Sequence, residues 1–199
     1  TGYLSDAAHA HSAHLIAIST DYVFDGRGTV AYRESDLTSP LGVYGTSKLA
    51  GEQRCRASDT IVRTSWVMGL RGRNVLHVIA QRVASGEPVR FVTDQVGTPT
   101  FSADLARGLA TFARQRPGGI WHFANRPATS WFDVAVAAAH AAGAPEGFVT
   151  PIVTAELSPT PAATRPAFSA LSTEKWEAAG FEPTPDWHDS LQRFFRDRK

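Results

Sequence analysis

The sequence has one cysteine, almost no charge imbalance and no long hydrophobic run. Cys55 alone excludes an internal disulfide framework and fits a reducing compartment. Lys and Arg number 20 against 19 Asp and Glu, so the charge balance does not indicate a nucleic-acid partner. No apolar run approaches the roughly 20 residues of a membrane-spanning helix, and residues 1–14 lack the layout of a secretory signal. We therefore expect a globular cytoplasmic protein with neither a membrane nor a nucleic-acid partner.

Short apolar runs alternate with helical patterns along the chain. The strand-like runs cover residues 14–19, 60–65, 89–92 and 120–124. Helical spacing marks residues 41–56, 74–84, 130–142 and a helix capped by Ser102, followed by two short helices near 172–179 and 187–198. Such alternation is typical of a parallel sheet covered by helices, so the predicted fold class is α/β.

Tyr44 and Lys48 form the first pattern that indicates chemistry. They stand four residues apart in a predicted helix, so both side chains share one face. A phenol with an ammonium beside it suits proton transfer to a carbonyl oxygen, because the positive charge favours the ionised phenol. The bare Tyr-x-x-x-Lys spacing is also common on exposed helix faces, so it is weak support when taken alone.

A hydroxyl group is predicted near this pair. Thr20 follows the first predicted strand, and ligands of open parallel α/β sheets bind outside the carboxyl ends of the strands. The Thr20 hydroxyl can therefore bond a substrate carbonyl beside Tyr44. The longer string from Tyr44 to Glu52, at 24 residues after Thr20, is much more specific than the pair alone.

These strings resemble the extended short-chain dehydrogenase/reductase superfamily, and within it the dTDP-4-dehydrorhamnose reductase family. The first two strings, 19–26 and 44–52, are shared with sugar-nucleotide epimerases and dehydratases. The Arg-Thr-Ser-Trp and Asp-Gln-x-Gly-x-Pro-Thr strings narrow the resemblance to the reductases. The matching segments are 19–26, 44–52, 63–67, 94–100, and Arg165-Pro166 followed by Ser169 and Leu171.

The resemblance implies a reaction and roles for individual residues. It implies NADPH- or NADH-dependent reduction of the C4 ketone of dTDP-4-dehydro-L-rhamnose to dTDP-L-rhamnose. Tyr44 would donate the proton, Lys48 would hold the nicotinamide ribose and support Tyr44, and Thr20 would bind the carbonyl. The remaining assignments are substrate contacts at Asp21 and Trp66, a diphosphate contact at Arg165, and a backbone border to the nicotinamide at Arg63, Thr64 and Ser65.

The resemblance also implies a Rossmann-like, doubly wound parallel sheet, of which this chain carries the C-terminal part, with a small mixed α/β substrate-binding region. Residues 1–66 and about 89–115 are expected to form the remainder of the dinucleotide-binding core. Residues about 67–88 and 116–199 are expected to form the substrate-binding region. The sequence contains no Gly-x-x-Gly-x-x-Gly turn between a strand and a helix, so the family's N-terminal strands are absent from it. We expect a longer protein, or a partner segment that supplies the missing half; a homodimer stays open.

Two other functions fit the same residues. One is a ketoreductase of another dTDP-deoxyhexose, because the sequence does not show which groups contact the sugar. The other is a non-catalytic binding subunit that resembles the regulatory subunit of methionine adenosyltransferase, which intact Thr20, Tyr44 and Lys48 disfavour. No metal site is predicted, because the clustered His9, His11 and His14 have no acidic or cysteine partner. The other tryptophans, Trp121, Trp131, Trp176 and Trp187, are expected to have packing roles.

Overall fold

A three-stranded parallel sheet lies at the centre of one half of the molecule. The computed structural model describes residues 1–159 and 161–198. In it, β1 (Ile16–Thr20), β2 (Thr60–Thr64) and β7 (Gly119–His122) pair in the order β1-β2-β7. Every residue of β2 is buried, as expected for a central strand rich in β-branched residues. The register places Thr20 opposite Thr64 at the carboxyl end.

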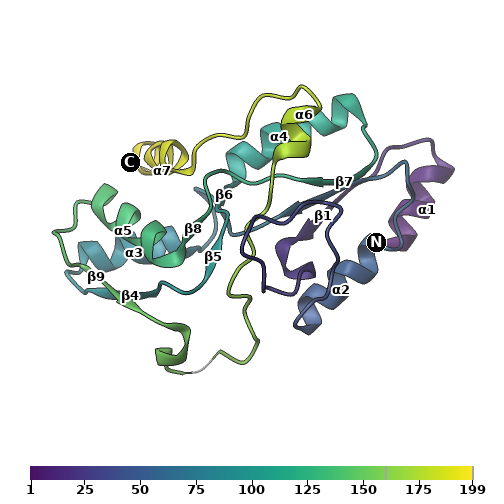
Figure 1. The fold of residues 1–199 in the computed structure, drawn as a ribbon. Helices are drawn as coiled ribbons and strands as arrows, with labels where there is room; N and C mark the ends of the chain where they lie inside the picture. Colours follow the sequence, from purple (N-terminus) through teal and green to yellow (C-terminus); the bar gives the residue numbers. More distant parts are fainter. Residues whose placement is uncertain (160, 199) are drawn as a thin grey trace.

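Helices cover both faces of this sheet. Figure 1 shows α1 (Gly2–Ala10) and α2 (Val43–Glu52) on one side, and α4 (Ser102–Gln115) and α6 (Glu174–Ala178) on the other. The core under α4 and α6 consists of Val62, Leu105, Phe112, Trp121, Phe123 and Trp176. A parallel sheet with helices on both faces confirms the predicted Rossmann-like α/β class.

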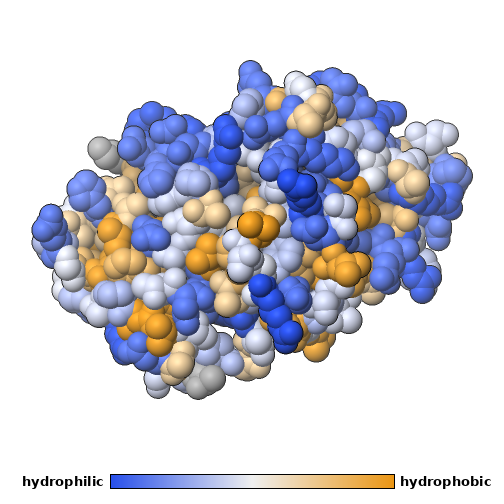
Figure 2. Space-filling model, viewed as in Figure 1, coloured by the Kyte–Doolittle hydropathy of each residue, from blue (hydrophilic) through white to orange (hydrophobic). Residues whose placement is uncertain are grey.

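The other half is a smaller mixed region. The strands β4 (Val89–Val92) and β9 (Val149–Ile152) pair in parallel and pack with α3 (Val75–Ala84), α5 (Trp131–Ala141) and α7 (Trp187–Asp197). A reciprocal capping box between Ser130 and Asp133 begins α5. Figure 2 shows a mainly hydrophilic surface with separate hydrophobic patches, several of them near the middle of the face.

Four short strands lie where the two halves meet. The pair β3 (Val67–Met68) and β6 (Thr100–Phe101) is parallel, and the pair β5 (Val96–Gly97) and β8 (Thr129–Ser130) is antiparallel. The single turns η1 (Asp21–Val23) and η2 (Thr154–Glu156) follow β1 and β9. Within the described residues, no helix is both long and apolar enough to cross a membrane.

Several boundaries differ from the sequence-based expectation. The helix expected over 41–56 is Val43–Glu52, because Gly42 is still extended and the Asp59 carboxylate holds the N–H of Arg56 in a turn. Ser102 is the first residue of α4 and not its cap. The expected boundary at residue 116 assigned β7 to the substrate-binding region, whereas β7 pairs with β2 in the main sheet. The helix α6, expected in the same region, likewise packs on the main sheet. Apart from β7 and α6, the division into two regions stays a prediction.

Candidate active site

The carboxyl ends of β1 and β2 carry four neighbouring polar residues. Thr20 ends β1 and Asp21 begins η1, while Thr64 ends β2 and Ser65 follows it. All four are buried, with no more than 5% of their surface exposed. Polar groups buried at this edge fit the rule that open parallel sheets bind ligands there.

Asp21 has an unusual environment for a carboxyl group. Its Oδ1 accepts a hydrogen bond from Thr20 Oγ1 at 3.0 Å, while its Oδ2 has no hydrogen-bond partner within residues 1–159 and 161–198. Burial raises the pKa of Asp21 from 3.8 to about 6, against the opposing effect of the Ser169 and Thr20 hydroxyls. At pH 7 the site therefore contains a buried carboxylate with one oxygen free to accept a hydrogen bond.

Helix α2 brings Tyr44 and Lys48 to this edge. Lys48 Nζ donates to the main-chain oxygen of Ile18 at 2.8 Å, which fixes the ammonium against β1. The Tyr44 ring is 55% exposed and meets the Tyr22 ring edge-on, with 5.9 Å between the centroids. Thr20, Tyr44 and Lys48 therefore lie at one end of the β1–α2 unit.

Gly45 permits this close approach of α2 to η1. A Cβ atom at position 45 would lie 2.1 Å from the main-chain oxygen of Tyr22, which is far below van der Waals contact. Any other residue would therefore push α2 away from η1. The close contact between α2 and η1 therefore requires glycine at position 45, between Tyr44 and Lys48.

Two hollows border the site. One, of about 320 Å³, has Tyr22 and Tyr44 in its wall and is bounded on its other side by residues 162–164 and Pro166. The other, of about 330 Å³, is lined by Val75, Arg90, Phe91, Val92, Gln95, Trp131, Leu157 and Arg165. Burial raises the pKa of Tyr22, and the nearby positive charge of Arg165 opposes this effect. Arg165 thus lines the second hollow and lies near enough to Tyr22 for its charge to act on it.

Trp66 and Trp131 form an aromatic stack next to the second hollow. Their ring centroids are 3.9 Å apart and the rings are nearly parallel, at 13°. Gly97 gives Trp66 room, because a Cβ there would lie 2.7 Å from the indole. Trp131 is the indole that lines the hollow, and Trp66 supports it. Sequence reasoning assigned Trp131 to packing alone, so it missed this position.

The side chains of residues 63–65 point into the protein. Arg63 is 2% exposed and pairs with Glu52. Thr64 Oγ1 bonds Thr100 Oγ1 at 3.1 Å, and Ser65 Oγ lies 2.8 Å from Thr98 Oγ1. These contacts join two sequence strings that are some thirty residues apart. The role of this backbone beside a nicotinamide stays a prediction.

The segment after Arg165 completes the convergence of the motif strings. Ser169 N–H donates to Val96 O at 2.8 Å, and Phe168 N–H donates to Gly26 O at 3.1 Å. Segments 19–26, 94–100 and 165–171 therefore lie side by side, although they are far apart in the sequence. Tyr22 and Gln95, which line the two hollows, were not expected from the sequence. Both lie inside these strings, two residues after Thr20 and one after Asp94, and their position in the strings is the signal that could have pointed to them.

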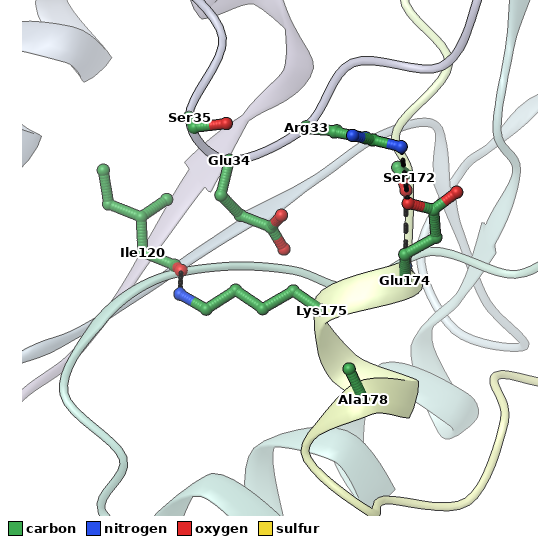
Figure 3. A pocket seen from close by; sticks show the side chains of 8 residues that line it. All are labelled: Arg33, Glu34, Ser35, Ile120, Ser172, Glu174, Lys175 and Ala178. Atoms are coloured by element: carbon green, nitrogen blue, oxygen red, sulfur yellow. Dashed lines mark hydrogen bonds and ion pairs between the residues drawn. The ribbon is translucent and has the colours of Figure 1, made fainter.

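A third hollow, of about 560 Å³, lies between residues 33–35 and α6. Its walls are Arg33, Glu34, Ser35, Ile120, Ser172, Glu174, Lys175 and Ala178 (Figure 3). Its charged groups already have partners within the protein. Arg33 pairs with Glu174 at 3.0 Å, Lys175 Nζ donates to the main-chain oxygen of Ile120, and Glu34 accepts the main-chain N–H of His122 in β7. No predicted site residue lines it. In the part of the chain that the structure describes, no group of three or more His, Cys, Asp or Glu is arranged to hold a metal ion.

Comparison with known proteins connects this arrangement to a family. The model of the RmlD substrate binding domain matches residues 1–199. The chain is 39% identical to a dTDP-4-dehydrorhamnose reductase of Streptomyces griseus, covering 97% of this chain and 66% of that protein. It is 33% identical to a dTDP-4-keto-6-deoxy-D-glucose reductase of Streptomyces niveus, covering 96% of this chain and 67% of that protein.

A solved structure agrees in fold. The dTDP-4-dehydrorhamnose reductase of Bacillus anthracis, in complex with NADP, superposes with a TM-score of 0.92 at 33% identity, covering 98% of this chain and 70% of that one. The chain spans about two thirds of the length of the curated relatives that it matches. With the whole of its sequence matched by the family model, this chain belongs to the RmlD substrate binding domain family.

Proposed function

We propose that the full-length protein reduces the C4 ketone of dTDP-4-dehydro-L-rhamnose to dTDP-L-rhamnose, using NADPH or NADH, in the synthesis of a sugar nucleotide for cell-surface polysaccharide. The observation that carries the proposal is the placement of Thr20, Tyr44 and Lys48 at one end of the β1–α2 unit. The similarity to the Streptomyces griseus and Bacillus anthracis reductases supports it. The single cysteine suits the cytoplasm, where we propose that the enzyme works.

The three groups have complementary roles toward a ketone. Tyr44 gives its hydroxyl proton to the carbonyl oxygen as that oxygen gains negative charge. Thr20 donates a second hydrogen bond to the same oxygen, for which its hydroxyl turns away from Asp21. Lys48, held at Ile18 O, keeps a positive charge close to the end of β1 where negative charge develops in the reaction.

The residues present fit one side of a nicotinamide cofactor, which supplies the hydride when it is bound. Lys48 is half-buried at the exposed face of β1, where its ammonium can reach a ribose hydroxyl. The buried backbone at Thr64 and Ser65 lies beside Thr20 and can border the nicotinamide ring. We further propose that the cofactor diphosphate is held by a segment outside this chain or by a partner.

The second hollow suits the nucleotide part of the substrate. Trp131 and Phe91 offer flat apolar surfaces, and Arg165 and Arg90 offer positive charge. A thymine base binds well to aromatic faces, and a diphosphate binds well to guanidinium groups. Arg165 lines this hollow and its charge acts on Tyr22, which supports the proposal that it holds the diphosphate between the base and the reacting sugar.

The test is the oxidation of NADPH by the full-length protein with dTDP-4-dehydro-L-rhamnose, with NADH run in parallel. We expect Tyr44→Phe to lower kcat about 100-fold, because the proton donor is lost. Near-normal turnover of Tyr44→Phe would exclude the proposed mechanism. Failure of the wild-type protein to bind any nicotinamide would favour the binding-subunit function instead.

A second candidate is reduction of a different dTDP-4-keto-6-deoxyhexose. The similarity to the Streptomyces niveus reductase, named for dTDP-4-keto-6-deoxy-D-glucose, favours this candidate. Both substrates present the same C4 ketone and nucleotide, and they differ in configuration at C3, which bears a hydroxyl, and at C5, which bears the methyl group. Comparing kcat/KM for the two substrates in the same assay decides between them.

A further inference from the structure

A buried cluster behind the site joins the three elements that carry its residues. Glu52, on the last turn of α2, receives two hydrogen bonds from Arg63 of β2: Nη2 to Oε2 at 2.7 Å and Nε to Oε1 at 3.0 Å. Ser19 of β1 donates its hydroxyl to the same Oε1. The three residues are 2–7% exposed, so water does not compete for these bonds.

Each member of the cluster is directly linked to a proposed site residue. Ser19 precedes Thr20, and Arg63 precedes Thr64. Glu52 is one helical turn after Lys48 and two turns after Tyr44, on the same side of α2. A shift of α2 along or away from the sheet would therefore break bonds in this cluster before it separated Tyr44 from Thr20.

Such a cluster is not explained by stability alone. A buried ion pair adds little net stability, because removing both charges from water opposes their attraction, and apolar residues of similar size often stabilise as well or better. What the pair does supply is a fixed orientation of α2 relative to β2. The two parallel bonds from Arg63 Nε and Nη2 hold the carboxylate of Glu52 in the plane of the guanidinium, and the third bond joins β1 to the same oxygen.

We propose that Ser19, Glu52 and Arg63 are positioning residues that set the location of Tyr44 and Lys48 relative to Thr20. The inference rests on the proposed reductase function and extends it. None of the three side chains touches either hollow, so the cluster acts through β1, α2 and β2. Loss of one bond should therefore reduce the rate of the chemical step more than it weakens substrate binding.

The test uses Ser19→Ala and Arg63→Lys in the full-length protein. Ser19→Ala removes only the bond to β1 and leaves the ion pair intact, and Arg63→Lys keeps the charge but removes the two-pronged contact. We expect kcat to fall about 3-fold to 10-fold for Ser19→Ala and 10-fold or more for Arg63→Lys, with KM for the sugar nucleotide within 3-fold. We also expect the pH midpoint of kcat to move in both variants, and the amide hydrogens of residues 44–48 to exchange faster with solvent.

The control is Arg193→Lys at a second arginine–carboxylate pair, in which Asp104 is buried and Arg193 is half-buried. Arg193 Nη2 contacts Asp104 Oδ1 at 2.6 Å, joining α7 to α4 away from the site. This variant should unfold at a lower temperature but keep the wild-type kcat, pH profile and exchange of residues 44–48. If Arg63→Lys does not fold, the result for Ser19→Ala alone tests the positioning role.

The inference would be overturned if Ser19→Ala, together with Arg63→Lys where it folds, kept the wild-type kcat, the wild-type pH profile and the wild-type hydrogen exchange of α2. Assaying the wild-type protein alongside the variants distinguishes failure of the reductase proposal from failure of the positioning proposal. Without wild-type turnover the reductase proposal fails, and hydrogen exchange of α2 still reports on positioning.

Discussion

Asp21 is a buried carboxyl group with one unpaired oxygen, and its replacement by asparagine gives a quantitative test of the site. The variant keeps the size of the side chain and an oxygen that can accept from Thr20 Oγ1, but it cannot ionise. Since Asp21 is 2% exposed, little else near it should change. Asparagine places an NH₂ group at the position of Oδ2 at every pH, so the change with pH in the stability difference between the wild type and Asp21→Asn reports the effect of the charge.

The magnitude follows from the pKa. Burial raises the pKa of Asp21 from 3.8 to about 6, which corresponds to a loss of about 3 kcal/mol of folding free energy for the ionised form. The folded protein holds the proton more tightly than the unfolded chain does, so the contribution of Asp21 to wild-type stability falls as the pH rises from about 4 to about 6. Below this window the penalty is absent, and above it the penalty is complete.

The assay is urea-induced unfolding of both full-length proteins at intervals between pH 4 and pH 8. At pH 7.5 we expect Asp21→Asn to be more stable by about 2–3 kcal/mol, a difference that shrinks to near zero at pH 4. Asp189→Asn, at an exposed acid in the first turn of α7, should show no comparable trend. A difference for Asp21→Asn that did not vary with pH, or had the opposite sign, would refute the reasoning. The same variant should bind the sugar nucleotide less well, because the free oxygen Oδ2 is replaced by an NH₂ donor.

Two further predictions concern the scaffold. Gly45→Ala should lower kcat by 100-fold or more and should also lower the unfolding temperature, because its methyl group would lie 2.1 Å from Tyr22 O. The control is Gly42→Ala, whose methyl group meets nothing within 4 Å and which should unfold within a few degrees of the wild type. Burial, helped by the charge of Arg63, lowers the pKa of His122 to about 3, so the contribution of His122 to wild-type stability should decline as the pH falls from about 6.5 toward 3, by at most about 5 kcal/mol and in the direction opposite to that of Asp21. His122→Gln should remove most of that decline in urea unfolding between pH 7 and pH 4, and an unchanged slope would contradict it.

The sequence predicted the part of the site that depends on local order. Tyr44 and Lys48 share a helix face, and Thr20 follows a strand, so regular geometry alone brings them to one edge of the sheet. The α/β class was predictable for the same reason, because the spacing of apolar residues along the chain distinguishes strands from helices. These features need only neighbours in sequence and the rules of parallel sheets.

The parts that sequence reasoning missed depend on contacts between distant segments. Trp131 stacks on Trp66 across 65 positions, and no local pattern distinguishes it from a core tryptophan. The side chain of Arg63 meets Glu52 inside the protein, a contact that depends on how α2 packs against β2. The placement of β7 in the main sheet is likewise a matter of pairing with β2, not of its own sequence.

The contrast between Glu52 and Asp21 shows which buried carboxylate serves structure and which serves a ligand. Three hydrogen bonds satisfy Glu52, from Ser19 and Arg63, so its charge is matched before any ligand arrives. Asp21 begins η1, two residues after Ser19. Among the described residues it has no cationic partner, and one of its oxygens has no donor. A buried carboxylate in that state lowers stability, and a chain selected for folding alone would replace it. A sugar hydroxyl that donates to Oδ2 would remove the penalty, so stability absent from the free protein would return when the substrate binds.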